Sequence, residues 1–386
     1  MRPIFGDSTD ENSSKDLGAS TNSKEGTVKS QKTGSKTSES TDGNKEGSTA
    51  SPPTIEKPIE PPPEPPLTRV PPVEPPVEPP VEPNRTLTEL EECQKAAKEI
   101  NFGSLGNPEE ITLPRSYDFL EGPVWIAKEK ALWVSAWNYS DASEGKGPPT
   151  TILQYSSGTW KTVSEKGLIR SNGMAVNSKG QVVAALHDTE TVAVISPPAS
   201  DRTILAQKYN DKNFNSPNDL ALRADDTLYF TDPNYQQDSR PGQGNVTGVY
   251  GVKPAGEVFV VDSGRDKPNG IALSPDAGFL YVGAADGKIQ KYKIGADGKA
   301  VFDSTFAMPN TNIDGMTVDC AGNVYASLHE AKRVEIYNDA GKSLGSISLR
   351  YNVTNVAFGG EDQKTLFITT AGHLFKLSMG LKGSPY

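Results

Sequence analysis

SPNDLALRADDTLYFTDPNY, from Ser216 to Tyr235, contains a plan that repeats along the chain. A polar head is followed by a short run with alternating apolar residues, an Asp-containing turn and a second β-rich run that ends at Asp232. Such alternation is typical of a half-buried strand, and the turn between the two runs is typical of a β-hairpin. We therefore interpret this stretch as one hairpin of a repeated β-sheet unit.

Five further segments fit the same template. Neighbouring heads are 40 to 51 residues apart, and in chain order they are Glu121, Asn172, Asn218, Asn269, Asp314 and Thr354. That spacing accommodates four short strands with their turns, and strand-built repeats of this length are typical of propeller blades. Six heads predict an all-β fold, a six-bladed β-propeller with its innermost strands around a central channel.

The heads are predicted to form a ring at one height in that channel, because each lies directly before an innermost strand. All six side chains carry oxygen atoms, and neither His nor Cys is among them. Carboxylate and amide oxygens are the ligands that Ca²⁺ prefers, although other divalent cations such as Mg²⁺ or Mn²⁺ also use them. The competing interpretation is that these polar residues satisfy backbone groups in turns, and that the Gly after four of the heads serves only tight backbone geometry.

The residues before the propeller differ from it in composition. Residues 1–50 are mostly small, polar or charged and are predicted to be a disordered leader. Residues 51–85 are rich in proline and repeat PPVE, which predicts a tether of polyproline II type, with a plain disordered tail as the alternative. Residues 86–110 are predicted to hold a short helix, Thr88–Glu99, and a connector, and residues 111–386 the propeller. The segment 111–119 is expected to supply the outer strand that closes the sixth blade.

The two cysteines, Cys93 and Cys320, leave two interpretations open. A bond between them would tie the helix to the propeller, and two unpaired thiols are the alternative. We find no signal peptide and no apolar stretch of about 18 residues, so no transmembrane segment is expected. The leader is of a kind that holds exported proteins away from an envelope, which favours a periplasmic or extracellular location over a cytoplasmic one.

The net charge of −10 and the absence of basic patches with interleaved aromatic residues argue against nucleic acid as a partner. GxSxG, Walker and dinucleotide-binding motifs were not found either, so the acidic ring is the main candidate for chemistry.

Several ordered motifs resemble the gluconolactonase, regucalcin and luciferin-regenerating-enzyme family. They are EGPVW at Glu121, SPNDL with FTDP between Ser216 and Pro233, PNGIALSPD at Pro268, DGMTVD at Asp314 and FGG at Phe358. The resemblance covers about residues 115–377 and implies a six-bladed propeller with one catalytic divalent ion, usually calcium, in the channel.

The resemblance also implies roles for individual residues. Glu121, Asn269 and Asp314 correspond to metal ligands, and Asp314 corresponds to the general base as well. Asn218 corresponds to an amide that lies beside the metal and contacts substrate, and we include it in the metal site. Asn172 and His187 have counterparts in the bacterial gluconolactonase-like branch.

Two positions on the substrate side depart from the family pattern. Ser216 stands where one branch has Arg, and Tyr235 lies where another branch continues with PPYG. We include both among the candidate substrate-binding residues. His329 joins them because it ends the second strand of its blade at the same distance from its head as His187 does.

The resulting expectation is a calcium-dependent lactonase, acting on a sugar lactone, in which the metal polarises the carbonyl and Asp314 is ligand and general base. A base that is also a metal ligand is a weak base, and water activated by the metal is the competing account. Two other functions fit the same ring: an organophosphate or ester hydrolase, and a non-catalytic, calcium-stabilised propeller that binds a ligand.

Overall fold

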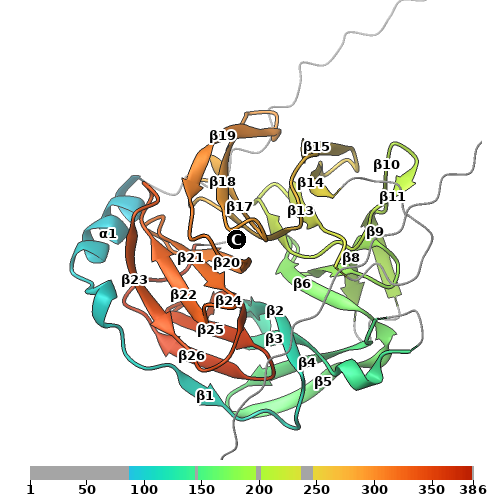
Figure 1. Ribbon diagram of the computed structural model, residues 1–386, viewed down its shortest axis with the longest axis horizontal. Coiled ribbons are helices and arrows are strands. Elements are labelled where there is room, and N and C mark those ends of the chain that lie inside the picture. The colour runs from blue at the N-terminus through green and yellow to red at the C-terminus, as the bar shows by residue number, and fades with distance from the viewer. Residues whose placement is uncertain (1–86, 144–146, 197–200, 236–246, 385–386) are drawn as a thin grey trace, which may run out of the picture. The chain divides into compact units, whose positions relative to one another are not determined.

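A computed structural model describes residues 87–143, 147–196, 201–235 and 247–384. In this part of the chain, six four-stranded antiparallel sheets are arranged around a common axis as propeller blades (Figure 1). The prediction of a six-bladed β-propeller is therefore confirmed. The predicted leader and tether lie outside the described residues.

The first three blades follow one another in sequence. Blade 1 consists of β2 (Phe119–Ile126), β3 (Ala131–Trp137), β4 (Thr150–Ser156) and β5 (Thr159–Ile169). Blade 2 consists of β6 (Ser171–Val176), β7 (Val182–Leu186), β8 (Thr191–Ser196) and β9 (Asp201–Ala206). A small hairpin, β10 (Lys208–Tyr209) and β11 (Lys212–Asn213), precedes blade 3, which consists of β12 (Leu220–Leu222), β13 (Leu228–Asp232), β14 (Gly248–Val252) and β15 (Val258–Asp262).

The last three blades complete the circle. Blade 4 consists of β16 (Pro268–Leu273), β17 (Phe279–Ala284), β18 (Ile289–Ile294) and β19 (Ala300–Ala307). Blade 5 consists of β20 (Ile313–Val318), β21 (Val324–Leu328), β22 (Arg333–Tyr337) and β23 (Ser343–Ser348). Blade 6 consists of β24 (Val353–Gly359), β25 (Thr365–Thr370), β26 (Leu374–Ser378) and an early strand, β1 (Glu109–Ile111). The first strands of neighbouring blades contact one another all the way round, β24 to β2 included.

The sixth blade is closed by the beginning of the propeller sequence. β1 pairs with β26, from Glu109 opposite Lys376 to Ile111 opposite Leu374. A closing strand is thus present as expected, but it overlaps the predicted segment 111–119 only at Ile111. Because β1 connects onward to blade 1, this pairing ties the two ends of the propeller together.

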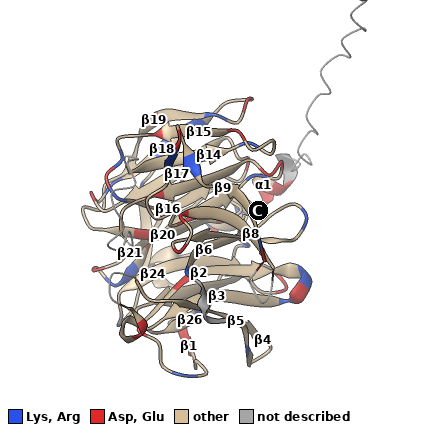
Figure 2. Cartoon of the chain, turned by 90° about the vertical axis from the view of Figure 1, so that its right-hand side faces the viewer, with Lys and Arg blue, Asp and Glu red and all other residues tan. Residues whose placement is uncertain are grey.

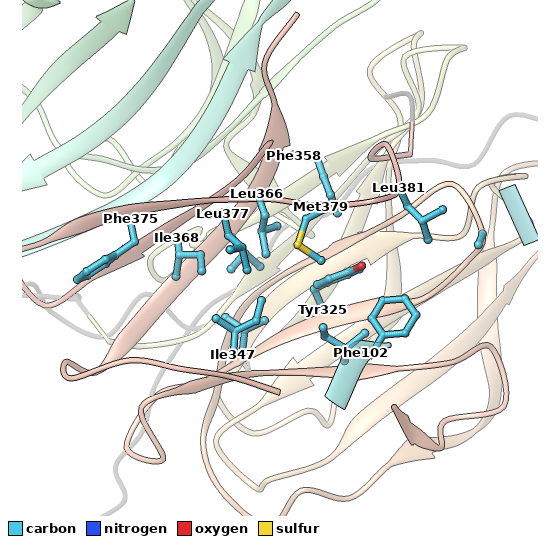
Figure 3. Close-up of a cluster of buried hydrophobic side chains, with 14 of the residues drawn as sticks. Phe102, Tyr325, Ile347, Phe358, Leu366, Ile368, Phe375, Leu377, Met379 and Leu381 are labelled. Carbon is cyan, nitrogen blue, oxygen red and sulfur yellow. The ribbon is translucent and has the colours of Figure 1, made fainter. Parts of the chain in front are cut away.

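Apolar side chains fill the spaces between neighbouring blades, because each sheet buries both of its faces. Figure 3 shows the cluster that joins blade 5, blade 6 and the segment before β1. Tyr325 and Phe358 meet there edge to face, with their ring centres 5.2 Å apart. Full burial of a large apolar side chain contributes about 1.5–3 kcal/mol, so these clusters hold the blades together.

A helix lies against this cluster. The helix α1 (Leu87–Lys98) is one residue earlier at each end than predicted, and its Cys93 forms a disulfide with Cys320 in the turn between β20 and β21, with Cα atoms 5.8 Å apart. The disulfide bond, which the sequence analysis left as one of two alternatives, is therefore present. Ala97, Ile100 and Phe102 pack on the same cluster, so α1 is attached both covalently and by apolar contact.

Acidic and basic residues are interspersed over the strands and turns seen in Figure 2. Within the described ranges, no helix is long and apolar enough to cross a membrane.

Candidate active site in the central channel

The head residues lie where the regular pairing of the strands is interrupted. The pairing of β16 with β17 is interrupted at Asn269 and Gly270, and that of β20 with β21 at Asp314 and Gly315. Such a bulge redirects a side chain away from the regular ladder. A Cβ atom on Gly270 would lie 2.1 Å from the Asp314 carbonyl oxygen, so the glycines do serve close approach of neighbouring blades.

Hydrogen bonds between blades hold these heads at matching heights. Three of them end on backbone oxygens of head residues: Ser135 Oγ donates to Asn172 O at 3.0 Å, Gly173 N to Asn218 O at 2.8 Å, and Thr231 Oγ1 to Asn269 O at 2.8 Å. Each of these three heads is therefore tied to a neighbouring blade.

Asp314 lies at the centre of a buried polar cluster. Its Oδ1 accepts a hydrogen bond from Asn269 Nδ2 at 2.7 Å, and its Oδ2 lies 3.0 Å from His329 Nδ1. His329 Nδ1 also lies 3.0 Å from the carbonyl oxygen of Val353. Because a carbonyl oxygen and a carboxylate both accept, Nδ1 must carry the proton. Burial raises the pKa of Asp314, and the hydrogen bond and charge of His329 lower it in part.

Glu121 is a second acidic residue of the ring. Its Oε2 accepts from Gly122 N at 2.9 Å and from Asn355 Nδ2 at 3.0 Å. Burial raises the pKa of Glu121 well above its ordinary value, and the neighbouring charges of Asp314 and Asp219 raise it further. The charge of Asp314 thus acts on Glu121, and Asn269 contacts Asp314 directly.

Asp219 and Asn355 are two channel residues that the sequence interpretation missed. Asn355 Nδ2 lies 3.4 Å from Asp219 Oδ2, and burial raises the pKa of Asp219 to about 7. A signal for them existed, because these residues follow the heads of blades 3 and 6, where blades 1, 2, 4 and 5 have glycine. A polar side chain at a position that is otherwise glycine is aimed into the channel.

The prediction that the sixth head, Thr354, supplies an oxygen to the ring is wrong. Its Oγ1 donates to the carbonyl oxygen of Leu120 at 2.6 Å and lies 2.8 Å from Thr369 Oγ1. Its side chain therefore joins blade 6 to blade 1, and the next residue, Asn355, takes the polar position of this blade. Successive side chains in a strand point to opposite faces, so an offset of one residue changes the role.

Three further predicted residues also lie at the ring. Asn218 and Asn172 are buried head residues, and Asn172 Oδ1 has no hydrogen-bond partner in the part of the chain that the structure describes. Tyr235 lies over blade 4, where its hydroxyl is 3.4 Å from the Lys267 carbonyl oxygen. Burial, followed by the charge of Asp314, raises the pKa of Tyr235, while a hydrogen bond with the Asn269 side chain lowers it. Tyr235 therefore lies close to Asn269 and Asp314.

Two further predicted residues, Ser216 and His187, make contacts that differ from those of the ring residues. Ser216 is fully buried; its Oγ donates to Pro233 O at 2.8 Å and its N–H to Asp232 Oδ1 at 2.9 Å. These bonds fix the loop that leads to Asn218. The backbone N–H of buried His187 donates to Arg170 O, whereas His329 at the corresponding position of blade 5 contacts Asp314 directly.

Aromatic residues from blade 1 lie beside His329. Phe119 stacks on Trp137 with ring centres 5.0 Å apart, and it lies 6.2 Å from Tyr139 and 6.1 Å from His329 by the same measure. Tyr139 is 57% exposed, so this wall runs from the buried Asp314–His329 pair to the surface.

The donor set fits a hard cation. Within the described ranges no three His, Cys, Asp or Glu side chains form a ready metal-binding group, so acids alone do not make the site. Two carboxylates, Glu121 and Asp314, are instead surrounded by amides, one of which has an unsatisfied buried oxygen at Asn172. Like charges that are buried together repel one another, and a divalent cation bound by these oxygens would relieve that repulsion.

The fold and this site define a class of protein, the six-bladed propellers that carry acids and amides at the mouth of the central channel. The chain belongs to the SMP-30/gluconolactonase/LRE-like family, whose profile matches residues 119–372. The family inferred from the motifs is thereby confirmed.

Individual relatives agree with this membership. A gluconolactonase from Zymomonas mobilis is 32% identical over 229 residues, which span 54% of this chain and 62% of that protein. The match thus covers less than two thirds of this relative's length. The solved structure of a gluconolactonase from Xanthomonas campestris superimposes with a TM-score of 0.60 at 26% identity, over 72% of this chain and 96% of that one. A calcium-binding regucalcin from Agrobacterium tumefaciens has a TM-score of 0.58 at 17% identity over 72% of this chain and 95% of its own, which shows the shared fold alone.

Proposed function

We propose that this protein is a calcium-dependent lactonase that hydrolyses a sugar lactone. The observation that carries the proposal is the hydrogen bond from Asn269 Nδ2 to Asp314 Oδ1, at 2.7 Å, inside a buried ring. The charge of Asp314 also raises the pKa of Glu121, an acid of the same ring. The names of the relatives from Zymomonas mobilis and Xanthomonas campestris support the choice of a lactone.

Glu121, Asn269 and Asp314 would hold the ion, with Asn218 beside it. When bound, calcium would supply positive charge next to the lactone carbonyl oxygen and stabilise the negative charge that develops there. Other divalent cations that accept oxygen ligands are weaker candidates for the same donors.

Asp314 would take the proton of the attacking water at a carboxylate oxygen. Burial raises its pKa and so strengthens it as a base, whereas the bound cation would weaken it, and water activated by the cation is the competing account. Asn269 and His329 each hold one of its oxygens, so the carboxylate cannot rotate freely. Phe119, Trp137 and Tyr139 would shield one side of the reacting ester from solvent, and Tyr235 would contact substrate above Asn269.

Hydrolysis of glucono-1,5-lactone, followed by proton release, tests the proposal. We expect activity that is lost on chelation and restored by CaCl₂, and an inactive Asp314→Ala variant. Asp319→Asn is the matched control, because Asp319 is a buried acid of the same blade that binds the turn residues Ala321 and Asn323. Activity that resists chelation would refute the proposal, and faster turnover of a fluorophosphate than of the lactone would favour the organophosphate hydrolase instead.

We also propose that the protein is exported. The disulfide between Cys93 and Cys320 supports this location, because such bonds persist mainly in oxidising compartments. Attachment to an envelope through residues 1–85 remains a prediction from composition.

A further inference from the structure

Asn355 is a buried amide in the channel, held by contacts with two blades. Its side chain is seated against Gly315, where an added Cβ atom would lie 1.8 Å from Asn355 Oδ1. Its backbone is also fixed, because Asn355 N donates to Thr369 Oγ1 at 3.0 Å. The side chain is therefore held in one place by both blades 5 and 6.

The contacts of the amide group assign its orientation. Asn355 Oδ1 accepts from the backbone N–H of Val356 at 2.8 Å, so the other end of the amide is the NH₂ group. That group donates to Glu121 Oε2 at 3.0 Å and lies 3.4 Å from Asp219 Oδ2. One amide thus bridges two buried carboxyl groups that belong to blades 1 and 3.

The bridge crosses the channel. Blades 3 and 6 are opposite each other in a ring of six, so the contact between Asp219 and Asn355 spans the axis. These two residues also border a cavity of about 650 Å³ that extends along the remaining length of the innermost strands, past Met174, Ile271 and Met316. They therefore lie between the candidate active site and this largely apolar space.

Glu121 Oε2 is fully engaged by this arrangement. It accepts from Gly122 N and from Asn355 Nδ2, so two donors hold the same oxygen and fix the position of the carboxyl group. We propose that Asn355 is a positioning residue, which holds Glu121 and Asp219 together across the channel so that Glu121 presents its remaining oxygen to the cation. This inference rests on the proposed calcium site and extends it to a residue that does not itself bind the ion.

Calcium titration of the full chain by calorimetry, after removal of bound metal, tests the inference. Asn355→Leu keeps the approximate size of the side chain but removes both N–H donors. Residues that orient a metal ligand typically change metal affinity by about 10- to 100-fold, so we expect the Kd for Ca²⁺ to rise by that factor. Asn355→Ser is the second variant, because it is smaller and cannot reach both carboxyl groups at once; its Kd should rise in the same direction.

The matched control is Asn323→Leu. Asn323 is also a buried amide that donates to a carboxylate, Asp319 Oδ2 at 2.8 Å, but it lies in the turn between β20 and β21. We expect this variant to lower the melting temperature of the calcium-free protein and to leave the calcium Kd unchanged. The inference is overturned if either Asn355 variant that folds binds calcium as the wild type does, or if Asn323→Leu weakens binding equally. A wild-type protein that binds no calcium would refute the proposed function itself, and that result is read from a separate titration.

Discussion

Removal of the disulfide between Cys93 and Cys320 should cost more stability than any single contact of α1. The bond joins residues that are 227 positions apart, and so it encloses most of the propeller sequence. The chain-entropy relation for a loop of this length gives about 5 kcal/mol at 25 °C. We expect the double variant Cys93→Ala with Cys320→Ala to lose up to this amount of unfolding free energy.

The assay is urea denaturation followed by tryptophan fluorescence, under conditions in which the protein refolds. The unfolded state without the bond is less compact, so the dependence of free energy on urea should become steeper in the variant. Ile100→Ala is the control, because it weakens the packing of the helical segment and leaves the covalent link intact. Half-burial of Ile100 predicts a loss of about 1–2 kcal/mol with unchanged urea dependence. A double variant as stable as the wild type, with the same slope, would show that the bond does not constrain the unfolded chain.

Three further predictions follow from individual contacts. Burial raises the pKa of Asp232 to about 7, above its unfolded value near 3.9, so its proton stabilises the fold at low pH. The unfolding free energy of the metal-free protein should fall as pH rises from about 4 to 7, and Asp232→Asn should reduce this slope by up to about 1.4 kcal/mol per pH unit; an unchanged slope would contradict this. Thr354→Val should lower the free energy of unfolding by about 1–3 kcal/mol, measured by urea denaturation, because the Leu120 carbonyl oxygen loses its donor. Calcium affinity should stay the same, and a large loss of affinity would show that Thr354 belongs to the metal site after all. His329→Leu should lower kcat about tenfold or more with little change in KM, since Asp314 loses an orienting donor, and an unaltered kcat would exclude that role.

The periodic features of the fold could be predicted from sequence. Alternating apolar residues and hairpin turns recur at each head, and the repeat length leaves room for four strands, so blade number and blade order followed directly. The grouping of Glu121, Asn269 and Asp314 at one site was predicted from the same regularity, because equivalent positions in a propeller face one channel.

The remaining features depend on local geometry that the repeat does not encode. Bulges at the heads decide which of two adjacent residues faces the channel, and in blade 6 this exchanges Thr354 for Asn355. Asp219 was missed for a related reason, since it directly follows a head that already accounted for the polarity of its blade. The disulfide could not be decided, because two cysteines 227 residues apart give no information about distance in space.

His187 and His329 show that an equal distance from the head of a blade does not predict equal contacts. Both directly follow the second strand of a blade at the same distance from the head. The ring of His329 lies 3.0 Å from Asp314, whereas the backbone N–H of His187 donates to Arg170 O. Equivalent positions share a height in the propeller, but the neighbouring blade decides what each side chain meets.

A crystal of the calcium-loaded protein, measured for the anomalous signal of the metal, tests the central claim most directly. We predict one strong peak in the channel at about 2.3–2.6 Å from side-chain oxygens of Glu121, Asn269 and Asp314, the distance at which proteins bind calcium. A peak bound elsewhere, or an empty channel at saturating calcium, would contradict the account.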